Sequence, residues 1–221
     1  MKKLFCFMLV LITVFSFTAV AETTKNDADK ALFILFNDNV ARNGCIGNML
    51  FAYPDGTDYS LSGSMSKDPK NASYLFAISE DLHRMYTFLY MPIEGSGEPD
   101  EIFKEYADVL FSSQVSMFDG ETVETRDGSF FDMPARLASY GASLGGIEHQ
   151  FKYFAVYTGT GLICIQADYD SDAAEHIDSD FNNLLGSCTF ENIDEIDFSA
   201  YNDGVPAADA VEQAEAEDTA K

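Results

Sequence analysis

Two runs of strand-like segments, each followed by one amphipathic helix, constrain the fold of this chain most strongly. The connections within each run have the length and composition of hairpins and turns. The expected strands are residues 49–53, 59–65, 74–79, 85–91, 122–126, 131–140, 148–157 and 162–169, with a short final strand within 187–190. Because strands segregated from helices pair with their chain neighbours, this order predicts an α+β fold with a mainly antiparallel β-sheet flanked by helices.

The first helix is expected over residues 99–112, because apolar residues recur there at the helical period. Pro99 suits its first position, since the proline ring fixes φ at a helical value. The residues expected to face the sheet are Ile102, Phe103, Tyr106, Val109 and Leu110. One apolar face predicts that this helix packs on the sheet.

The second helix is expected after Asp172, which would cap it, with Glu175 as its partner in a capping box. The residues expected to face the sheet are Ala173, Ile177, Phe181, Leu184 and Leu185. In this interpretation the acidic residues near position 172 act locally, through the positive end of the helix dipole.

Residues 1–21 have the three parts of a secretory signal peptide: a basic start, an apolar stretch and the cleavage sequence Ala19-Val20-Ala21. The apolar stretch, residues 4–17, is shorter than the roughly 20 residues that a membrane-spanning helix needs. We therefore expect cleavage after Ala21, an extracytoplasmic location (secreted or periplasmic), and no membrane span after cleavage.

The rest of the chain divides into three parts. Residues 22–48 form an N-terminal segment. The sequence does not choose there between a helix over 28–43 and a buried strand over 31–36. Residues 49–190 form the α+β domain. Residues 191–221 form an acidic C-terminal tail that we expect to be partly disordered, because its end is polar and lacks aromatic residues.

The chain is strongly acidic, with a formal net charge of −24, and residues 153–220 contain no Lys or Arg. Such a field repels nucleic acid and favours a cationic or basic partner, or a metal ion. Removal of the signal peptide leaves Cys45, Cys164 and Cys188, so one internal disulfide or none can form. Which pair would form it stays open.

Gly141-Ala142-Ser143-Leu144-Gly145 fits the nucleophile pattern of serine hydrolases, and Ser143, Asp168 and His176 follow one another in the order of that family's triad. The pattern requires a helix directly after the serine, whereas residues 148–157 have the alternation of a strand. We therefore expect Ser143 on a connection between two antiparallel strands. A small secreted hydrolase remains an alternative function.

Asp168, Asp170 and Asp172 begin like a calcium-binding loop. An EF-hand requires glycine at its sixth position and glutamate at its twelfth, where this chain has Ala173 and Ser179. A looser calcium site, formed by the three aspartates and Glu175, is the alternative to helix capping. It would make the chain a calcium-dependent interaction protein.

The order of these elements resembles that of the PsbP-like fold. The resemblance covers residues 49–190. It is carried by Leu50-Phe51-Ala52-Tyr53-Pro54, by the helix start Glu98-Pro99-Asp100, by Asp132-Met133-Pro134-Ala135-Arg136, and by the late hairpin and helix. It implies an α/β/α sandwich with a non-enzymatic binding or accessory role. No complete catalytic or cofactor motif is present, so we expect an exported, non-catalytic binding or accessory protein.

Overall fold

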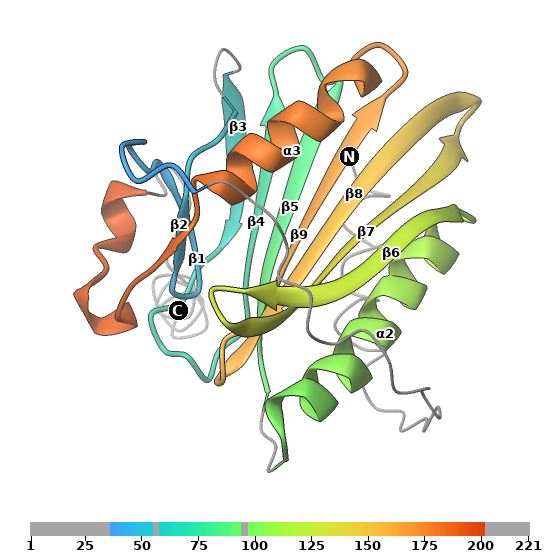
Figure 1. The fold of residues 1–221 in the computed structure, drawn as a ribbon. Helices are drawn as coiled ribbons and strands as arrows, with labels where there is room; N and C mark the ends of the chain where they lie inside the picture. Colours follow the sequence, from blue (N-terminus) through green and yellow to red (C-terminus); the bar gives the residue numbers. More distant parts are fainter. Residues whose placement is uncertain (1–35, 55–57, 94–96, 202–221) are drawn as a thin grey trace, which may run out of the picture.

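A seven-stranded antiparallel sheet forms the centre of the protein (Figure 1), as the computed structural model shows for residues 36–54, 58–93 and 97–201. Its strand order is β3-β4-β5-β9-β8-β7-β6. The strands are β3 (Tyr59–Ser64), β4 (Ser73–Ser79), β5 (Arg84–Pro92), β6 (Glu121–Phe130), β7 (Met133–Leu144), β8 (Ile147–Tyr157) and β9 (Gly161–Asp170). The first run of strands joins the second where β5 pairs with β9, so both runs contribute to one sheet.

One face of the sheet packs against helix α3 (Ile177–Gly186), and we call it the α3 face. A small three-stranded sheet covers the same face and consists of β1 (Gly44–Ile46), β2 (Met49–Phe51) and β10 (Thr189–Phe190). The ring of Phe51 stacks on Phe88 of β5, with centroids 4.3 Å apart. Helix α3 and the small sheet both bury apolar residues against the large sheet, so the α3 face holds the larger hydrophobic core.

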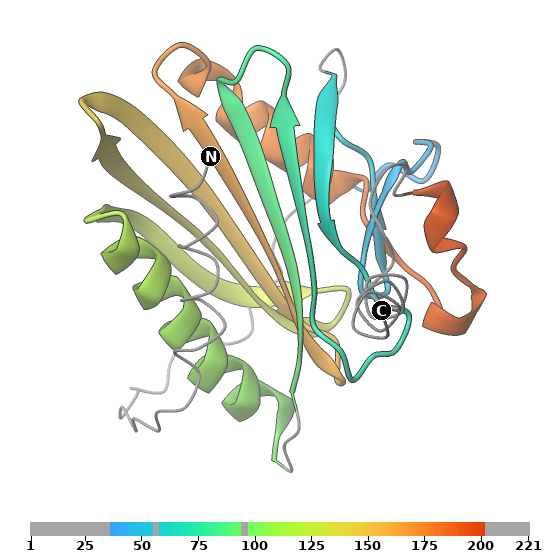
Figure 2. The same cartoon turned by 180° about the vertical axis from the view of Figure 1, so that it is seen from behind.

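The opposite side, the α2 face, packs against helix α2 (Pro99–Met117). The helix buries Phe103, Ala107, Leu110 and Phe111 against β7 and β8. Helix α3 lies in front of the sheet in Figure 1 and behind it in Figure 2. The helices therefore sandwich the sheet, which confirms the expected α+β class and α/β/α layers.

Residues on β7, β8 and β9 alternate between the two cores, because successive side chains of a strand point to opposite faces. On β9, Leu162 and Cys164 lie in the core under α2, whereas Ile163 and Ile165 lie in the core under α3. This alternation assigns each polar side chain on these strands to one face of the sheet.

Tight turns connect the long strands. Gly145 and Gly146 join β7 to β8 with φ of 64° and 88°, the left-handed values that a two-residue hairpin turn requires. The expected turn at residues 158–161 is confirmed between β8 and β9, where the Thr158 N–H donates to the Gly161 carbonyl at 2.9 Å.

Several expected details were wrong. Helix α2 continues to Met117, beyond the expected end at residue 112, and Val109 is exposed. Phe131 was expected to start a strand, but it lies in the β6–β7 turn with φ of 51°. Strands β2 and β3 belong to different sheets. The expected inward face of the second helix is correct, since all five of its residues are buried.

The ends of the packed region extend beyond residues 49–190. Residues 36–43 contain turns and β1 follows them, while the earlier part of segment 22–48 and the signal peptide lie outside the described residues. Near the other end, Ile196 and Phe198 are buried against the core, and residues 202–221 are not described. None of the described helices is long and apolar enough to cross a membrane.

Candidate functional site

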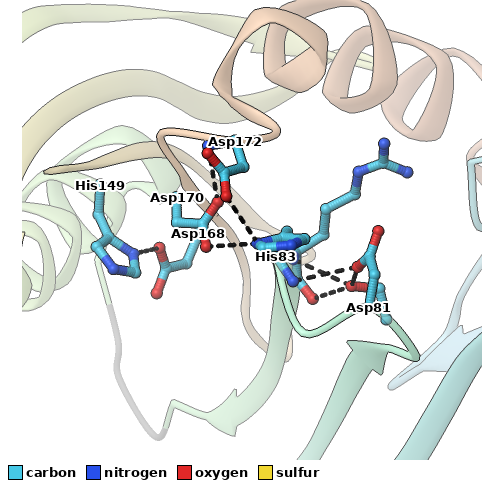
Figure 3. A network of polar contacts seen from close by, with 8 residues as sticks. Asp81, His83, His149, Asp168, Asp170 and Asp172 are labelled. Atoms are coloured by element: carbon cyan, nitrogen blue, oxygen red, sulfur yellow. Dashed lines mark hydrogen bonds and ion pairs between the residues drawn. The ribbon is translucent and has the colours of Figure 1, made fainter. Parts of the chain in front are cut away.

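A row of polar side chains runs along β9 on the α2 face, where α2 no longer covers the sheet. Gln166, Asp168 and Asp170 occupy alternate positions of the strand, so they project from the same face. Each has a partner on a neighbouring segment: Tyr140 donates to Gln166 at 2.9 Å, and His149 and His83 bond to Asp168 and Asp170. The row ends in two histidine–aspartate pairs (Figure 3).

His83 lies at the end of the β4–β5 connection, which holds it above β9. Its N–H donates to Asp81 Oδ1 at 3.1 Å, and its carbonyl accepts from the Asp170 N–H at 3.1 Å. Asp81 itself accepts from the Ser79 hydroxyl at 2.5 Å. These bonds fix the backbone of His83 and place its ring beside the carboxylate of Asp170.

The His83 ring and two carboxylates converge at this point. His83 Nδ1 is 2.7 Å from Asp170 Oδ2 and 3.9 Å from Asp172 Oδ2. Asp170 Oδ1 accepts from the Asp172 N–H at 3.0 Å, which turns the chain so that Asp172 approaches His83. One donor atom from each of the three residues lies within 4.8 Å of the other two, and within the described ranges no other such group of His, Cys, Asp and Glu occurs.

The pair His83–Asp170 has the electrostatics of a charge-assisted hydrogen bond. The bond to Asp170 raises the pKa of the His83 imidazole above its ordinary value and outweighs burial, which acts in the opposite direction. Burial acts to raise the pKa of the Asp170 carboxyl, but the hydrogen bonds from His83 and from the Asp172 N–H hold it below the usual range. Asp170 therefore carries its negative charge at neutral pH.

The neighbouring pair lies deeper. Asp168 Oδ1 is 2.6 Å from His149 Nδ1, and the two side chains are 10% and 19% exposed. Burial raises the pKa of the Asp168 carboxyl, and the hydrogen bond with His149 offsets only part of that effect. Asp168 is thus bound to His149 and does not join His83, Asp170 and Asp172.

The expected calcium ligands are only partly brought together. Asp170 and Asp172 meet, but Glu175 is exposed and lies 3.4 Å from His176. The expected cap was also wrong: α3 begins at Ile177, and neither it nor the short helix η1 (Ala174–His176) has a side-chain cap. The Asp172 side chain therefore points to His83 and does not cap a helix.

The structure separates the residues of the expected hydrolase triad. Ser143 was expected on the connection between two strands, but it lies within β7 opposite Glu148 of β8. A strand follows it where the hydrolase pattern has a helix. Alternation along β7 places Ser143 on the α3 face, whereas Asp168 projects from the α2 face. Asp168 bonds to His149, and His176 lies beside Glu175.

Sequence reasoning missed His83 and His149 as members of this site. Their partners are 87 and 19 residues away in the chain, so no local spacing connects them. The pairings that bring them together are those of β5 and β8 with β9. A correct strand order, combined with the alternation along β9, would have placed both histidines beside the aspartates.

Comparison with solved structures identifies the fold at low sequence identity. No family model and no curated protein sequence matches the chain. The solution structure of cyanobacterial PsbP (CyanoP) from Synechocystis aligns with a TM-score of 0.51 and 11% identity, over 72% of this chain and 99% of that one. LpqN, described as involved in cell envelope biogenesis of Mycobacterium tuberculosis, aligns with a TM-score of 0.44 and 10% identity, over 69% and 89%. The protein therefore has a PsbP-like fold.

Proposed function

We propose that this is an exported, non-catalytic accessory protein that binds a divalent transition-metal ion through His83, Asp170 and Asp172. The observation that supports the proposal is the convergence of three donor atoms within 4.8 Å. In a tetrahedral site with bonds of about 2.1 Å, neighbouring ligand atoms are about 3.4 Å apart. The exposed Asp172 side chain can close the remaining distance, because its carboxylate is 75% exposed.

The chemistry of the three ligands favours a transition metal over calcium. Calcium is bound by oxygen atoms, whereas a set of one imidazole and two carboxylates suits ions such as Zn²⁺. The formal net charge of −24 attracts cations of either kind, so it does not discriminate between them. His83 is therefore the residue that sets the preference.

Metal binding competes with the ion pair that His83 and Asp170 form on their own. The Nδ1 atom that would bind the metal is the atom that bonds to Asp170. A bound ion would replace this hydrogen bond, because a histidine ligand must be unprotonated at the binding nitrogen. If the His83–Asp170 pair has only a structural role, Zn²⁺ should stabilise the protein no more than other divalent ions do.

Thermal unfolding with Zn²⁺, Ca²⁺ or Mg²⁺ at equal ionic strength tests the proposal. A ligand at a hundredfold excess over Kd stabilises the native state by about 2.7 kcal/mol, which raises Tm by several degrees in a domain of this size. We expect this rise with Zn²⁺, whereas Ca²⁺ should act no more strongly than Mg²⁺. Isothermal titration calorimetry should give one Zn²⁺ per chain.

His176→Asn is the matched control for His83→Asn. His176 also lies beside a carboxylate, that of Glu175, but among the described residues it belongs to no group of three His, Cys, Asp or Glu side chains whose donor atoms converge. We expect His83→Asn to abolish the Zn²⁺ response and His176→Asn to retain it. A Zn²⁺ response that survives His83→Asn would refute the metal site.

Export is tested separately. The basic start, apolar stretch and Ala19-Val20-Ala21 support cleavage after Ala21. When the full chain is expressed in a bacterium, we expect mass spectrometry of the extracytoplasmic fraction to find a mature protein that starts at Glu22. A protein that stays in the cytoplasm with its first 21 residues intact would contradict export.

A further inference from the structure

The described part of the chain leaves a large part of the α2 face open. Helix α2 packs mainly on β7 and β8, toward one edge of the sheet. In Figure 2, where α3 lies behind the sheet, no described element crosses β4 or β5. These two strands are therefore covered on the α3 face and open on the α2 face, and we call their open surface the β4–β5 stripe.

The β4–β5 stripe is apolar. By strand alternation, partly exposed apolar side chains project from it: Tyr74, Phe76, Ile78, Met85, Leu89 and Met91. Thr87 is the exception. The neighbouring edge strand β3 differs, because its Ser60 and Ser62, which lie opposite Ile78 and Phe76, are polar and exposed. The apolar surface therefore ends at β3.

The composition of β4 and β5 indicates that another layer belongs on this stripe. A strand with one solvated face alternates apolar and polar residues, whereas a strand covered on both faces is apolar almost throughout. Residues 74–78 are apolar at every position, and so are residues 85–91 except Thr87. Strand β3, with serine at alternate positions, follows the first pattern. Strands β4 and β5 follow the second, although the structure describes a covering layer on one face only.

The flank of α2 that faces the stripe is apolar as well. Asp108 bonds to Arg136 of β7, whose guanidinium also bonds to β6, so this flank of α2 faces the edge strand β6. The helical period places Ile102, Tyr106 and Val109 on the opposite flank, toward β9 and β5. Val109 is 40% exposed there. The open surface thus has an apolar floor and an apolar side.

The width of the stripe matches one α-helix. Neighbouring strands are about 4.8 Å apart, so a helix about 10 Å in diameter lies over both. The midline between β4 and β5 is three strand spacings, about 14 Å, from the midline between β7 and β8 that α2 covers. Packed helices need about 8–10 Å between their axes. A second helix therefore fits beside α2 in the same layer.

The charges near the stripe favour a basic occupant. Met85 lies directly opposite Asp168 of β9, and Asp170 follows on the same face. Asp81 lies in the turn that joins the two strands. Together with the formal net charge of −24, these carboxylates repel a second copy of this chain and an anionic lipid surface. They attract a helix that carries Lys or Arg beside its apolar face.

We propose that the β4–β5 stripe binds an amphipathic helix of a basic partner protein. The apolar face of that helix packs on the stripe and on the adjoining flank of α2. Its Lys or Arg side chains lie at the end of the stripe that bears Asp168 and Asp170. The apolar contacts do not require a metal ion, so the proposal stands apart from the His83 site.

Methyl NMR of the mature protein, labelled with ¹³C at its methionine methyl groups, tests the proposal in EDTA. The probe is an amphipathic Leu/Lys peptide of about 18 residues, or five helical turns. Met85 and Met91 lie on the stripe, whereas Met49 and Met65 are buried in the core under α3 and serve as internal controls. We expect the peptide to shift the signals of Met85 and Met91 and to leave those of Met49 and Met65 unchanged.

Two further peptides separate recognition of the stripe from attraction by charge alone. A Leu/Lys peptide of the same composition in scrambled order has no apolar face, and a Leu/Glu peptide with the original pattern has the wrong charge. Neither should shift Met85 or Met91. Equal shifts with the scrambled peptide would overturn the proposal, and so would equal shifts with the Leu/Glu peptide.

Phe76→Thr should weaken binding of the Leu/Lys peptide at least about tenfold, because it removes an aromatic ring from the middle of the stripe. Val123→Thr is the matched control, since Val123 is an exposed apolar residue on β6, at the far edge of the sheet, and this variant should bind like the parent. Unchanged Met49 and Met65 signals show that the Phe76 variant keeps its core. Binding by Phe76→Thr as tight as that of the parent would overturn the proposal.

The same spectra identify other occupants. The proposal is overturned if the Leu/Lys peptide leaves Met85 and Met91 unshifted. Shifts of these two methyl groups that depend on the concentration of the protein alone would identify a second copy as the occupant. Nuclear Overhauser contacts of these methyl groups with residues 22–35 would show that the chain covers the stripe itself. Either result would also overturn the proposal.

Discussion

The hydroxyl groups of Tyr86 and Tyr169 lie 2.7 Å apart in the core under α3, and both side chains are fully buried. Tyr169 donates in turn to Asp180 of α3 at 2.8 Å, so the shared proton of the pair comes from Tyr86. Burial raises the pKa of both tyrosines, which keeps them protonated. The chain of hydrogen bonds connects β5, β9 and α3.

The two tyrosines should differ in their contributions to stability. Tyr169→Phe leaves the buried Tyr86 hydroxyl without its acceptor, and we expect a loss of about 1–3 kcal/mol in the free energy of unfolding. Tyr86→Phe leaves Tyr169 bonded to Asp180 and should cost less. Urea unfolding measures both, and the double variant should lose less than the sum, because the residues share one network. Additive losses would show that the hydroxyl groups act independently.

Arg136 should be the most sensitive charged residue of the sheet. Its side chain is 6% exposed, and its Nε and Nη2 donate to Asp127 of β6 at 2.6 and 3.0 Å, while Nη1 donates to Asp108 of α2 at 2.5 Å. Arg136→Ala removes a buried guanidinium that bonds to two partly exposed carboxylates, and we expect a loss of about 1.5–3 kcal/mol by urea unfolding. Arg136→Lys should also destabilise the protein, because lysine lacks the planar guanidinium group that donates to both carboxylates. A lysine variant as stable as the parent would contradict this.

The three cysteines should be reduced and unreactive in the native state. Cys45, Cys164 and Cys188 are buried and free. Burial raises the pKa of the Cys45 and Cys164 thiols to about 12, so little reactive thiolate is present at neutral pH. Ellman's reagent should label them slowly in buffer and completely in guanidinium chloride. Rapid labelling without denaturant would contradict the described packing.

Ser143 should not react with serine-hydrolase probes. It lies in a strand, and strand alternation separates it from Asp168. We expect no covalent labelling by a fluorophosphonate probe, with Ser143→Ala indistinguishable from the parent protein. Labelling that Ser143→Ala abolishes would promote the hydrolase alternative.

Stability should decrease above neutral pH because of His83. Its pKa is raised in the folded protein, so its contribution is complete below the unfolded-state value of about 6.5 and is lost as the pH rises through the folded-state pKa. With EDTA present, Tm of the parent should fall more between pH 6 and 8 than Tm of His83→Gln. His176→Gln is the control and should follow the parent. A constant difference in Tm between parent and His83→Gln across this range would contradict the pairing with Asp170.

The order and type of most elements were readable from the sequence, because local patterns determine them. Alternating residues over 148–157 predicted β8, Pro99 marked the start of α2, and the glycines near position 159 predicted a hairpin. The errors arose where tertiary contacts outweigh local preference. Phe131 adopts left-handed φ in a turn, where it packs on Phe36 and Phe190.

Only the tertiary structure decided which polar residues meet. The acidic residues of β9 were identifiable as candidates, but their histidine partners depend on the pairing of β5 and β8 with β9. Sequence patterns report contacts a few residues apart, whereas strand order joins distant segments. The sequence by itself therefore determined the layers of this protein. The packing of those layers determined which polar side chains lie together.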